Sequence, residues 1–136
     1  MSSFNEGLIA DFRANGGRAT SGPFVGRELL LLTTVGARSG EVRTVPLVYN
    51  RDGNRLVVVA SKGGAPTNPA WYHNLRRNPI VEVEVGAERF KADARVAEGT
   101  ERRRLYDQHV AMMPVFAEYE LRTERVIPVI TLDRQG

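Results

Sequence analysis

Three strand-forming stretches follow one another with only tight turns between them, and this succession constrains the fold most. They are Glu28–Thr34, Val42–Tyr49 and Arg55–Ala60. The first is a nearly continuous aliphatic run, as expected for a strand buried on both faces. In the second, Pro46 indicates a bulge or an edge position, because proline cannot donate a ladder hydrogen bond. The turns at 35–41 and 50–54 are short, and the second contains an Asp-Gly pair that favours a hairpin. The chain therefore begins its sheet with antiparallel neighbours.

The second half of the chain adds more strands and short helices. Ile80–Val85 alternates apolar and acidic residues, and it returns through Gly86 and Ala87 as Glu88–Val96. A last strand is expected over Val126–Asp133. The expected helices are Ser3–Asn15, Pro69–Arg77, Gly99–Met113 and Val115–Arg122. About six strands with hairpin links predict a mainly β fold with flanking helices (α+β), in which an antiparallel sheet closes into a small barrel. Strands and helices do not alternate regularly, which disfavours a doubly wound parallel sheet.

The signals at the helix ends divide the chain into parts. Ser3 and Glu6 suit a capping box, while Asn68 suits an N-cap with Pro69 as the first helical residue. Phe4, Leu8 and Phe12 share one face of the first helix, which we expect to pack as a lid on the barrel. Neither a repeat nor a linker is visible. We therefore expect one domain over 1–136, with a helix and glycine-rich connector at 1–26 and the barrel at 27–134.

Composition excludes some chemistry. The chain has no cysteine, which removes disulfides and thiolate sites, and its net charge of +3 rests almost wholly on arginine, since Lys62 and Lys91 are the only lysines. So mild an excess suits an anionic small ligand at least as well as nucleic acid or an acidic membrane surface. No stretch approaches the ~20 apolar residues of a membrane span, and no signal peptide is visible. We expect a cytoplasmic protein with at most peripheral membrane contact.

Two glycine-containing segments could bind an anion. In the turn Gly36–Gly40, glycines, an arginine and a serine can direct several donors into one concavity, although an ordinary hairpin turn has the same composition. In the loop that begins at Ser61, Lys62 precedes two glycines and could hold a phosphate or carboxylate, or could simply be solvated. Neither segment has the spacing of a nucleotide-binding P-loop or of the dinucleotide fingerprint.

Two helical segments could line a pocket. The helix after Pro69 contains the only tryptophan, Trp71, and its N-terminus would follow the lysine loop. Further on, Met113, Phe116 and Tyr119 suit a flat, apolar ligand, but they suit a protein core equally well. The two histidines, His73 and His109, are 36 positions apart without a metal-ligand pattern, so no metal site is expected.

Together these segments resemble the deazaflavin-dependent nitroreductases, also called F420H2-dependent quinone reductases. The resemblance covers roughly residues 28–132. It rests on four stretches and on a closing pattern, namely Leu32–Gly40, Pro46–Tyr49, Val59–Gly64, Asn68–Leu75, and Tyr119, Thr123, Arg125, Ile127 and Pro128. The serine-lysine-glycine-glycine loop followed by the Asn-Pro-x-Trp-Tyr helix is the most specific part.

The resemblance implies an FMN-binding split-barrel-like fold, the deazaflavin coenzyme F420 as hydride carrier, and reduction of a small organic acceptor such as a quinone, enone or nitro compound. It implies cofactor contacts at Ala37, Arg38, Ser39, Gly40, Arg43, Pro46, Val48, Val59, Ala60, Ser61, Lys62, Gly63, Ala70, Trp71 and Asn74. Ser61 would lie near the reactive carbon of the coenzyme, Tyr119 could deliver a proton, and Met113, Phe116 and Tyr119 would close the substrate side. Relatives that reduce nitroimidazoles tend to carry tyrosine where this chain has Phe116, which disfavours nitro compounds.

Other functions remain open at this stage. An FMN-binding split-barrel oxidoreductase would share the fold but would need no site for the acidic oligoglutamate tail of F420. A non-enzymatic F420 carrier would bind the coenzyme without turnover. A basic interaction module is disfavoured, because the arginines are scattered among acidic residues. The sequence is compatible with a monomer or a homodimer. The expected reaction partner is a small-molecule electron acceptor.

Overall fold

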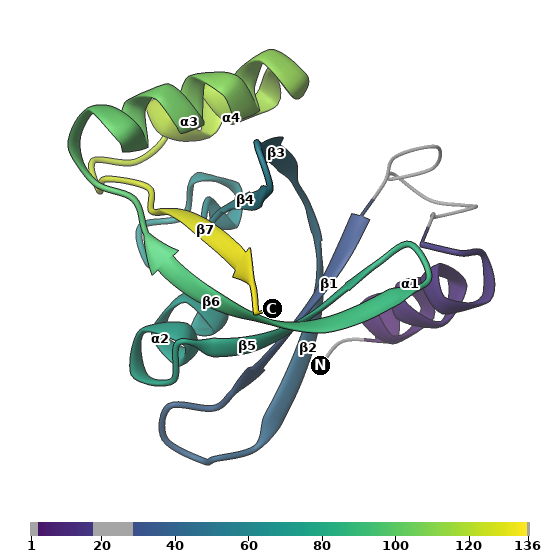
Figure 1. The fold of residues 1–136 in the computed structure, drawn as a ribbon. Coiled ribbons are helices and arrows are strands. Elements are labelled where there is room, and N and C mark those ends of the chain that lie inside the picture. The colour runs from purple at the N-terminus through teal and green to yellow at the C-terminus, as the bar shows by residue number, and fades with distance from the viewer. Residues whose placement is uncertain (1–2, 18–28, 136) are drawn as a thin grey trace.

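The computed structural model describes residues 3–17 and 29–135, and these residues form a curled antiparallel sheet with helices around it (Figure 1). The strands are β1 (Leu29–Val35), β2 (Val42–Val48), β3 (Asn50–Asp52), β4 (Arg55–Val59), β5 (Ile80–Val85), β6 (Glu88–Val96) and β7 (Val129–Arg134). The helices are α1 (Ser3–Ala14), α2 (Ala70–Arg77), α3 (Gly99–Met112) and α4 (Val115–Leu121), and a short 3-10 helix, η1, spans Lys62–Gly64.

The strand order β2-β1-β5-β6-β7-β4-β3 pairs strands that are far apart in the chain, and every pair is antiparallel. Strands β2 and β3 lie at opposite ends of this order, yet only Tyr49 separates them in the chain, so the sheet must curl on itself. The mainly β, split-barrel expectation is confirmed. Pro46 lies opposite Leu31 in the edge strand β2, as its missing N–H donor predicts.

Strand β1 is buried on both faces, as its aliphatic run predicts. Leu30 and Leu32 belong to the cluster inside the curl, whereas Leu29 and Leu31 pack against α1, where Phe12 is 1% exposed. The first helix is therefore a lid on the outside of the sheet, as expected. The side chains of residues 3–5 lie outside the described part of the chain, as does the connector from residue 18 to 28, so the proposed capping box and the start of the first strand are not described.

A third hydrophobic cluster, besides the one inside the curl and the one beneath α1, lies between helices α3 and α4 and the strands β4 and β7. Helices α3 and α4 lie together at the top of Figure 1 and pack Leu105, Tyr106 and Phe116 against the outer faces of β4 and β7, including Val57 and Val129. The apolar residues of β4 and of the first half of β7 are thus buried on both faces of the sheet.

Three local expectations were wrong. The sheet has a seventh strand, because Asn50–Asp52 pairs with β4 and leaves only residues 53 and 54 in the turn, where Gly53 has a φ of 61°. Helix α2 begins at Ala70 without a side-chain cap, because the Asn68 oxygen accepts a hydrogen bond from Arg125 instead. The last strand begins at Val129 and not at Val126, whose side chain is mostly exposed.

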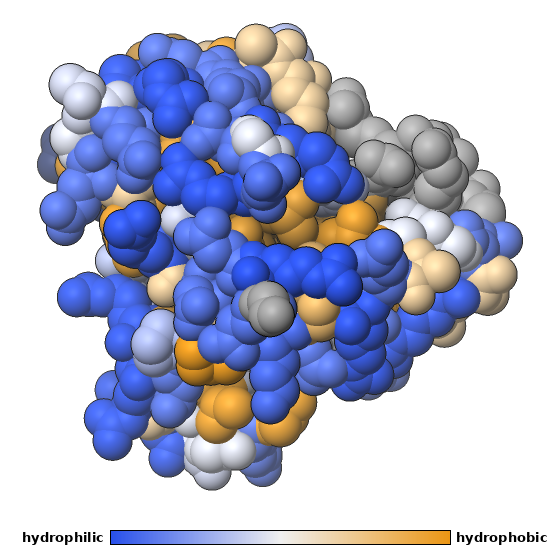
Figure 2. All heavy atoms as spheres, viewed as in Figure 1, coloured by the Kyte–Doolittle hydropathy of each residue, from blue (hydrophilic) through white to orange (hydrophobic). Residues whose placement is uncertain are grey.

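The surface in the view of Figure 1 is mainly hydrophilic, with small separate hydrophobic patches (Figure 2). Within residues 3–17 and 29–135, no helix has the length and the apolar character that crossing a membrane requires.

Candidate functional site

An apolar cavity of about 340 Å³ lies where the edge strand β2, the lysine loop and helix α4 meet. Its lining includes expected cofactor and substrate contacts from four separate segments, namely Pro46, Val48, Val59, Ser61, Lys62, Gly63, Trp71, Met113, Phe116 and Tyr119. The cavity walls also include Val45, Leu47 and Pro69, which were not among the expected cofactor or substrate contacts. The structure therefore brings together segments up to about 70 residues apart around one open apolar pocket.

A second, more polar cavity of about 560 Å³ lies beside the turn between β1 and β2. Its lining includes Ala37, Arg38, Ser39, Arg43, Ala70 and Asn74, which were expected to contact the cofactor, together with Gly36 and His73. The two cavities adjoin along the start of α2, because Ala70 lines the polar one while its neighbours Pro69 and Trp71 line the apolar one. A cationic compartment thus borders an apolar compartment.

The amide of Asn74 holds the turn against α2. Its Oδ1 accepts a hydrogen bond from the backbone N–H of Ala37 at 2.9 Å, and its Nδ2 donates to Thr34 Oγ1 at 3.1 Å. The side chain is 7% exposed, so these bonds are shielded from water. Asn74 therefore fixes the position of the polar cavity from behind, while Arg38 and Arg43 remain at its surface.

The lysine loop has an unusual backbone. Ser61 has right-handed helical angles (φ −73°, ψ −38°), and it is followed by three positive φ values, 47° at Lys62, 63° at Gly63 and 82° at Gly64. A right-handed residue followed by left-handed ones turns successive N–H groups to one side, which is the backbone geometry of an anion-binding nest. Lys62 is the only described non-glycine residue with a positive φ, and such strain concentrates at functional sites.

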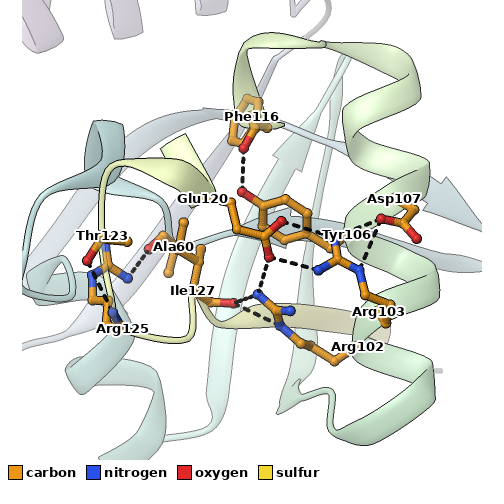
Figure 3. Close-up of polar contacts among 10 residues, drawn as sticks. All are labelled: Ala60, Arg102, Arg103, Tyr106, Asp107, Phe116, Glu120, Thr123, Arg125 and Ile127. Carbon is orange, nitrogen blue, oxygen red and sulfur yellow. Dashed lines mark hydrogen bonds and ion pairs between the residues drawn. The ribbon is translucent and has the colours of Figure 1, made fainter. Parts of the chain in front are cut away.

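Arg125 holds this loop in place from the segment that precedes β7. Its guanidinium donates to the carbonyl oxygens of Ala60 (3.2 Å), Ser61 (2.6 Å) and Ala65 (2.8 Å) and to Asn68 Oδ1 (2.7 Å). Figure 3 shows the bond to Ala60, and also Thr123, whose hydroxyl oxygen accepts from the Arg125 backbone N–H. Burial lowers the pKa of the Arg125 guanidinium. The sequence placed Arg125 in the closing pattern but gave no sign of this role.

Helix α4 places its aromatic residues against the apolar cavity. Phe116 is 6% exposed, and its ring lies 5.1 Å from that of Tyr119 at an interplanar angle of 71°. The Tyr106 hydroxyl of α3 donates to the Phe116 carbonyl oxygen at 2.6 Å (Figure 3). Burial raises the pKa of Tyr106 to about 12, so this hydroxyl remains a donor. The backbone of Phe116 is thereby tied to α3.

Two expected cofactor residues line neither cavity. Gly40 lies in the β1–β2 turn with a φ of 72°, and a Cβ there would meet nothing within 4 Å. Ala60 is fully buried, and its carbonyl accepts from Arg125. Both shape the loops that carry the cavities. Across the described ranges, no three His, Asp or Glu side chains cluster in a way that could hold a metal ion.

His109 of α3 is a buried residue that sequence reasoning left without a role. It is 0% exposed, its Nδ1 lies 2.6 Å from Asn50 Nδ2, and its Nε2 has no hydrogen-bond partner. An unpaired buried donor costs about 1–3 kcal/mol of stability, so such a group needs an explanation. Burial lowers the pKa of His109 to about 4.

The low pKa of His109 predicts a loss of stability in mild acid. The unfolded chain takes up this proton near pH 6.5, whereas the folded protein resists it down to about pH 4, so the free energy of unfolding should fall by about 3 kcal/mol as pH drops through that window. Urea unfolding between pH 7 and pH 4.5 measures this slope. Hydrogen bonds from arginines lower the pKa values of Asp52, Glu82 and Glu120. The stability that these carboxylates contribute is therefore lost mainly at a pH below the range in which His109 takes up its proton. His109→Gln should flatten the slope, and an unchanged slope in that variant would contradict the assignment.

Comparisons with known proteins agree with this arrangement. A family model of F420H(2)-dependent quinone reductases matches residues 8–134. The F420H(2)-dependent quinone reductase Rv1261c of Mycobacterium tuberculosis is 42% identical over 111 residues, which cover 78% of this chain and 73% of that protein. The solved F420-H2 dependent reductase FDR-A superposes with a TM-score of 0.71 at 40% identity, covering 77% of this chain and 93% of its own. A domain-swapped dimer superposes with a TM-score of 0.74 at 36% identity, covering 92% and 94%.

The family model spans nearly the whole chain, and the mycobacterial relative matches more than two thirds of it well above 30% identity. Each of the four stretches that carry the resemblance in the sequence contributes residues to the two adjoining cavities. The chain therefore belongs to the family of F420H(2)-dependent quinone reductases.

Proposed function

We propose that this protein binds coenzyme F420 and reduces a quinone-like acceptor with it. The observation that carries the proposal is the meeting of a cationic cavity and an apolar cavity at the start of α2. Coenzyme F420 has a flat deazaflavin ring at one end and a phosphate with an acidic oligoglutamate tail at the other. A ligand of that kind needs both compartments side by side.

The residues present fit this coenzyme. Arg38 and Arg43 supply guanidinium groups suited to phosphate and carboxylate, and Arg43, now paired with the exposed Glu41 at 2.6 Å, would exchange that partner for the coenzyme. The nest-like backbone at Ser61 and Lys62 adds N–H donors beside the lysine ammonium. Pro46, Val48 and Trp71 supply apolar and aromatic surface for a ring system.

When bound in its reduced form, the coenzyme supplies a hydride, and a quinone that accepts a hydride and one proton becomes the hydroquinone. The protein's own residues hold the two reactants together and exclude water, which is the larger part of the catalytic effect expected here. We assign Ser61, which lines the apolar cavity and is 8% exposed, to the cofactor side. We assign Tyr119 to the acceptor side, where its hydroxyl or solvent delivers the proton.

The acceptor side favours flat, apolar molecules. Met113, Phe116 and Tyr119 offer one hydroxyl among three apolar or aromatic side chains. Phe116 has no group to donate a hydrogen bond to a nitro oxygen. We therefore propose quinones first and enones second, with nitro compounds as poor acceptors. Anaerobic assays that follow the loss of reduced F420 with one member of each class rank the three; a nitro compound that outpaces the quinone would contradict the ranking.

Lys62→Ala should weaken F420 binding about tenfold, the equivalent of about 1.4 kcal/mol for one lost charged contact. Alanine retains a Cβ at the same positive φ, so the backbone strain is unchanged and the loss reports the ammonium. Fluorescence titration with F420, and separately with FMN, measures the effect. Lys91→Ala removes the only other lysine, which lies on β6 away from both cavities, and should leave binding unchanged.

The same titration separates the competing functions. Tighter binding of FMN than of F420 in the wild-type protein would favour an FMN-dependent oxidoreductase. Tight F420 binding without turnover of any acceptor would favour a coenzyme carrier. We further propose a homodimer acting in the cytoplasm; the domain-swapped dimer among the similar structures supports the first point, and sedimentation analysis tests it.

A further inference from the structure

The protonation state of His109 follows from a chain of hydrogen bonds that starts at a backbone carbonyl. Gln108 Nε2 donates to the Arg51 carbonyl oxygen at 2.6 Å, and because a carbonyl can only accept, this atom of Gln108 must be the amide nitrogen. The same nitrogen lies 2.7 Å from Asn50, so that atom must be the oxygen Oδ1. The remaining amide nitrogen of Asn50 is therefore the group that faces His109.

His109 must accept this bond at Nδ1, across 2.6 Å. A neutral imidazole carries one hydrogen, so it resides on Nε2, and protonation of Nδ1 would oppose two N–H groups. The Nε2–H has no nitrogen or oxygen partner, and it is the one side-chain atom in the described residues that is both buried and unpaired. The closest ring contact of the imidazole is Phe116, with centroids 4.3 Å apart and an interplanar angle of 86°.

The Phe116 ring is consequently held on two sides. The imidazole packs nearly perpendicular to it from α3, and the Tyr119 ring packs against it at 71° from α4. Perpendicular arrangements of this kind align the positive edge of one ring with the negative face of the other. Asn50 in turn ties the imidazole to strand β3. A continuous set of contacts thus runs from the sheet, through His109, to a ring that lines the apolar cavity.

We propose that His109 is a positioning residue: in its neutral form with the hydrogen on Nε2, it fixes the orientation of the Phe116 ring and so sets the width of the space for a flat acceptor. The kinetic consequence of this inference rests on the proposed function. The tautomer of His109 and the geometry of the rings do not depend on that function. A leucine in place of His109 would fill the core and remove the unpaired Nε2–H, at the cost of the acceptor for the Asn50 amide N–H, and it would leave the Phe116 ring free to turn.

The kinetic test combines His109→Leu with Phe116→Leu. His109→Leu should raise the KM for a quinone at least fivefold, with a smaller change in kcat and with the Kd for F420 within twofold of wild type. Leu105→Val is the control, because Leu105 is as buried as His109 and belongs to the cluster that contains Phe116 but lines neither cavity, and it should leave the KM unchanged. In the Phe116→Leu background the effect of His109→Leu should disappear. An unchanged KM in His109→Leu, or an equal effect with and without Phe116, would overturn the proposal.

A second arm does not depend on activity. Long-range 1H–15N spectra of the wild-type protein should show an unprotonated Nδ1 and a protonated Nε2 at His109, and nuclear Overhauser contacts should link the imidazole to the Phe116 ring. A hydrogen on Nδ1, or a Phe116 ring that samples several orientations, would overturn the proposal even in a fully active enzyme. If instead the spectra agree and no quinone is reduced by the wild type, the function fails while the ring positioning stands.

Discussion

Replacing Arg125 by alanine should weaken F420 binding at least tenfold and lower the free energy of unfolding by about 3 kcal/mol. Its guanidinium joins both ends of the 60–68 loop through four hydrogen bonds, all to neutral oxygen acceptors. Hydrogen bonds that involve a charged group contribute about 1.5–3 kcal/mol each, and solvent recovers part of that when a half-buried site opens. The loop that carries Ser61 and Lys62 would then no longer be held in its left-handed conformation.

The charge of Arg125 also matters, because none of its hydrogen-bond partners is acidic. An arginine with neutral acceptors contributes an uncompensated positive potential next to the site proposed for an anionic coenzyme. Arg125→Lys retains the charge but cannot reach all four oxygens, since lysine is a single flexible donor group. We expect it to recover part of the affinity and little of the loop order. Fluorescence titration measures the first, and hydrogen exchange at residues 61–65 measures the second.

Arg103 provides a matched control for Arg125. It also makes four side-chain hydrogen bonds, to Asp107 and Glu120, but its side chain is 46% exposed and it contacts neither cavity (Figure 3). Exposed ion pairs contribute little, so Arg103→Ala should lower the free energy of unfolding by about 1 kcal/mol or less and leave F420 binding unchanged. Equal effects of the two substitutions on binding would show that Arg125 has no special role in the loop.

Gly64→Ala should destabilise the protein by about 3 kcal/mol and also displace the residues on the acceptor side of the site. Gly64 has a φ of 82°, and a Cβ there would lie 2.8 Å from the Arg122 Cβ and 2.9 Å from the Tyr119 carbonyl oxygen. Backbone strain accounts for about 1–2 kcal/mol, and overpacking against a helix accounts for about 1–3 kcal/mol. Relief of the clash requires α4 to move away from the loop, and α4 carries Phe116 and Tyr119.

Gly63→Ala separates the two causes. Its φ of 63° imposes similar backbone strain, but a Cβ there would meet nothing within 4 Å. Chemical denaturation of both variants should therefore show that Gly64→Ala is the more destabilising, and the difference measures the clash alone. The KM of Gly64→Ala for a quinone reports the displacement of α4. If the two variants lose equal stability, the close packing between the loop and α4 is not what restricts this position.

The local elements of this protein could be predicted from the sequence. Three of these patterns can be recognised within a few residues of sequence: the aliphatic run of β1, the alternation in β5 and the proline in the edge strand β2. The first two follow from burial, and the third follows from the missing N–H donor of proline. The same holds for the composition of the two loops, where glycine and lysine mark a turn and a charge. These local patterns also carried the family resemblance, which the comparisons confirm.

Only the tertiary structure decided which of these segments lie next to one another. It also decided which hydrogen-bond partner each buried polar side chain has. Asn68 has the composition of a helix cap, yet its oxygen binds Arg125, which is 57 positions away. His109 has no local signal at all, and its tautomer depends on Asn50 and on a carbonyl of the neighbouring residue. Sequence patterns report the conformation of neighbours in the chain, whereas hydrogen-bond partners across the curl are fixed only when the sheet closes and every buried polar group must be satisfied at once.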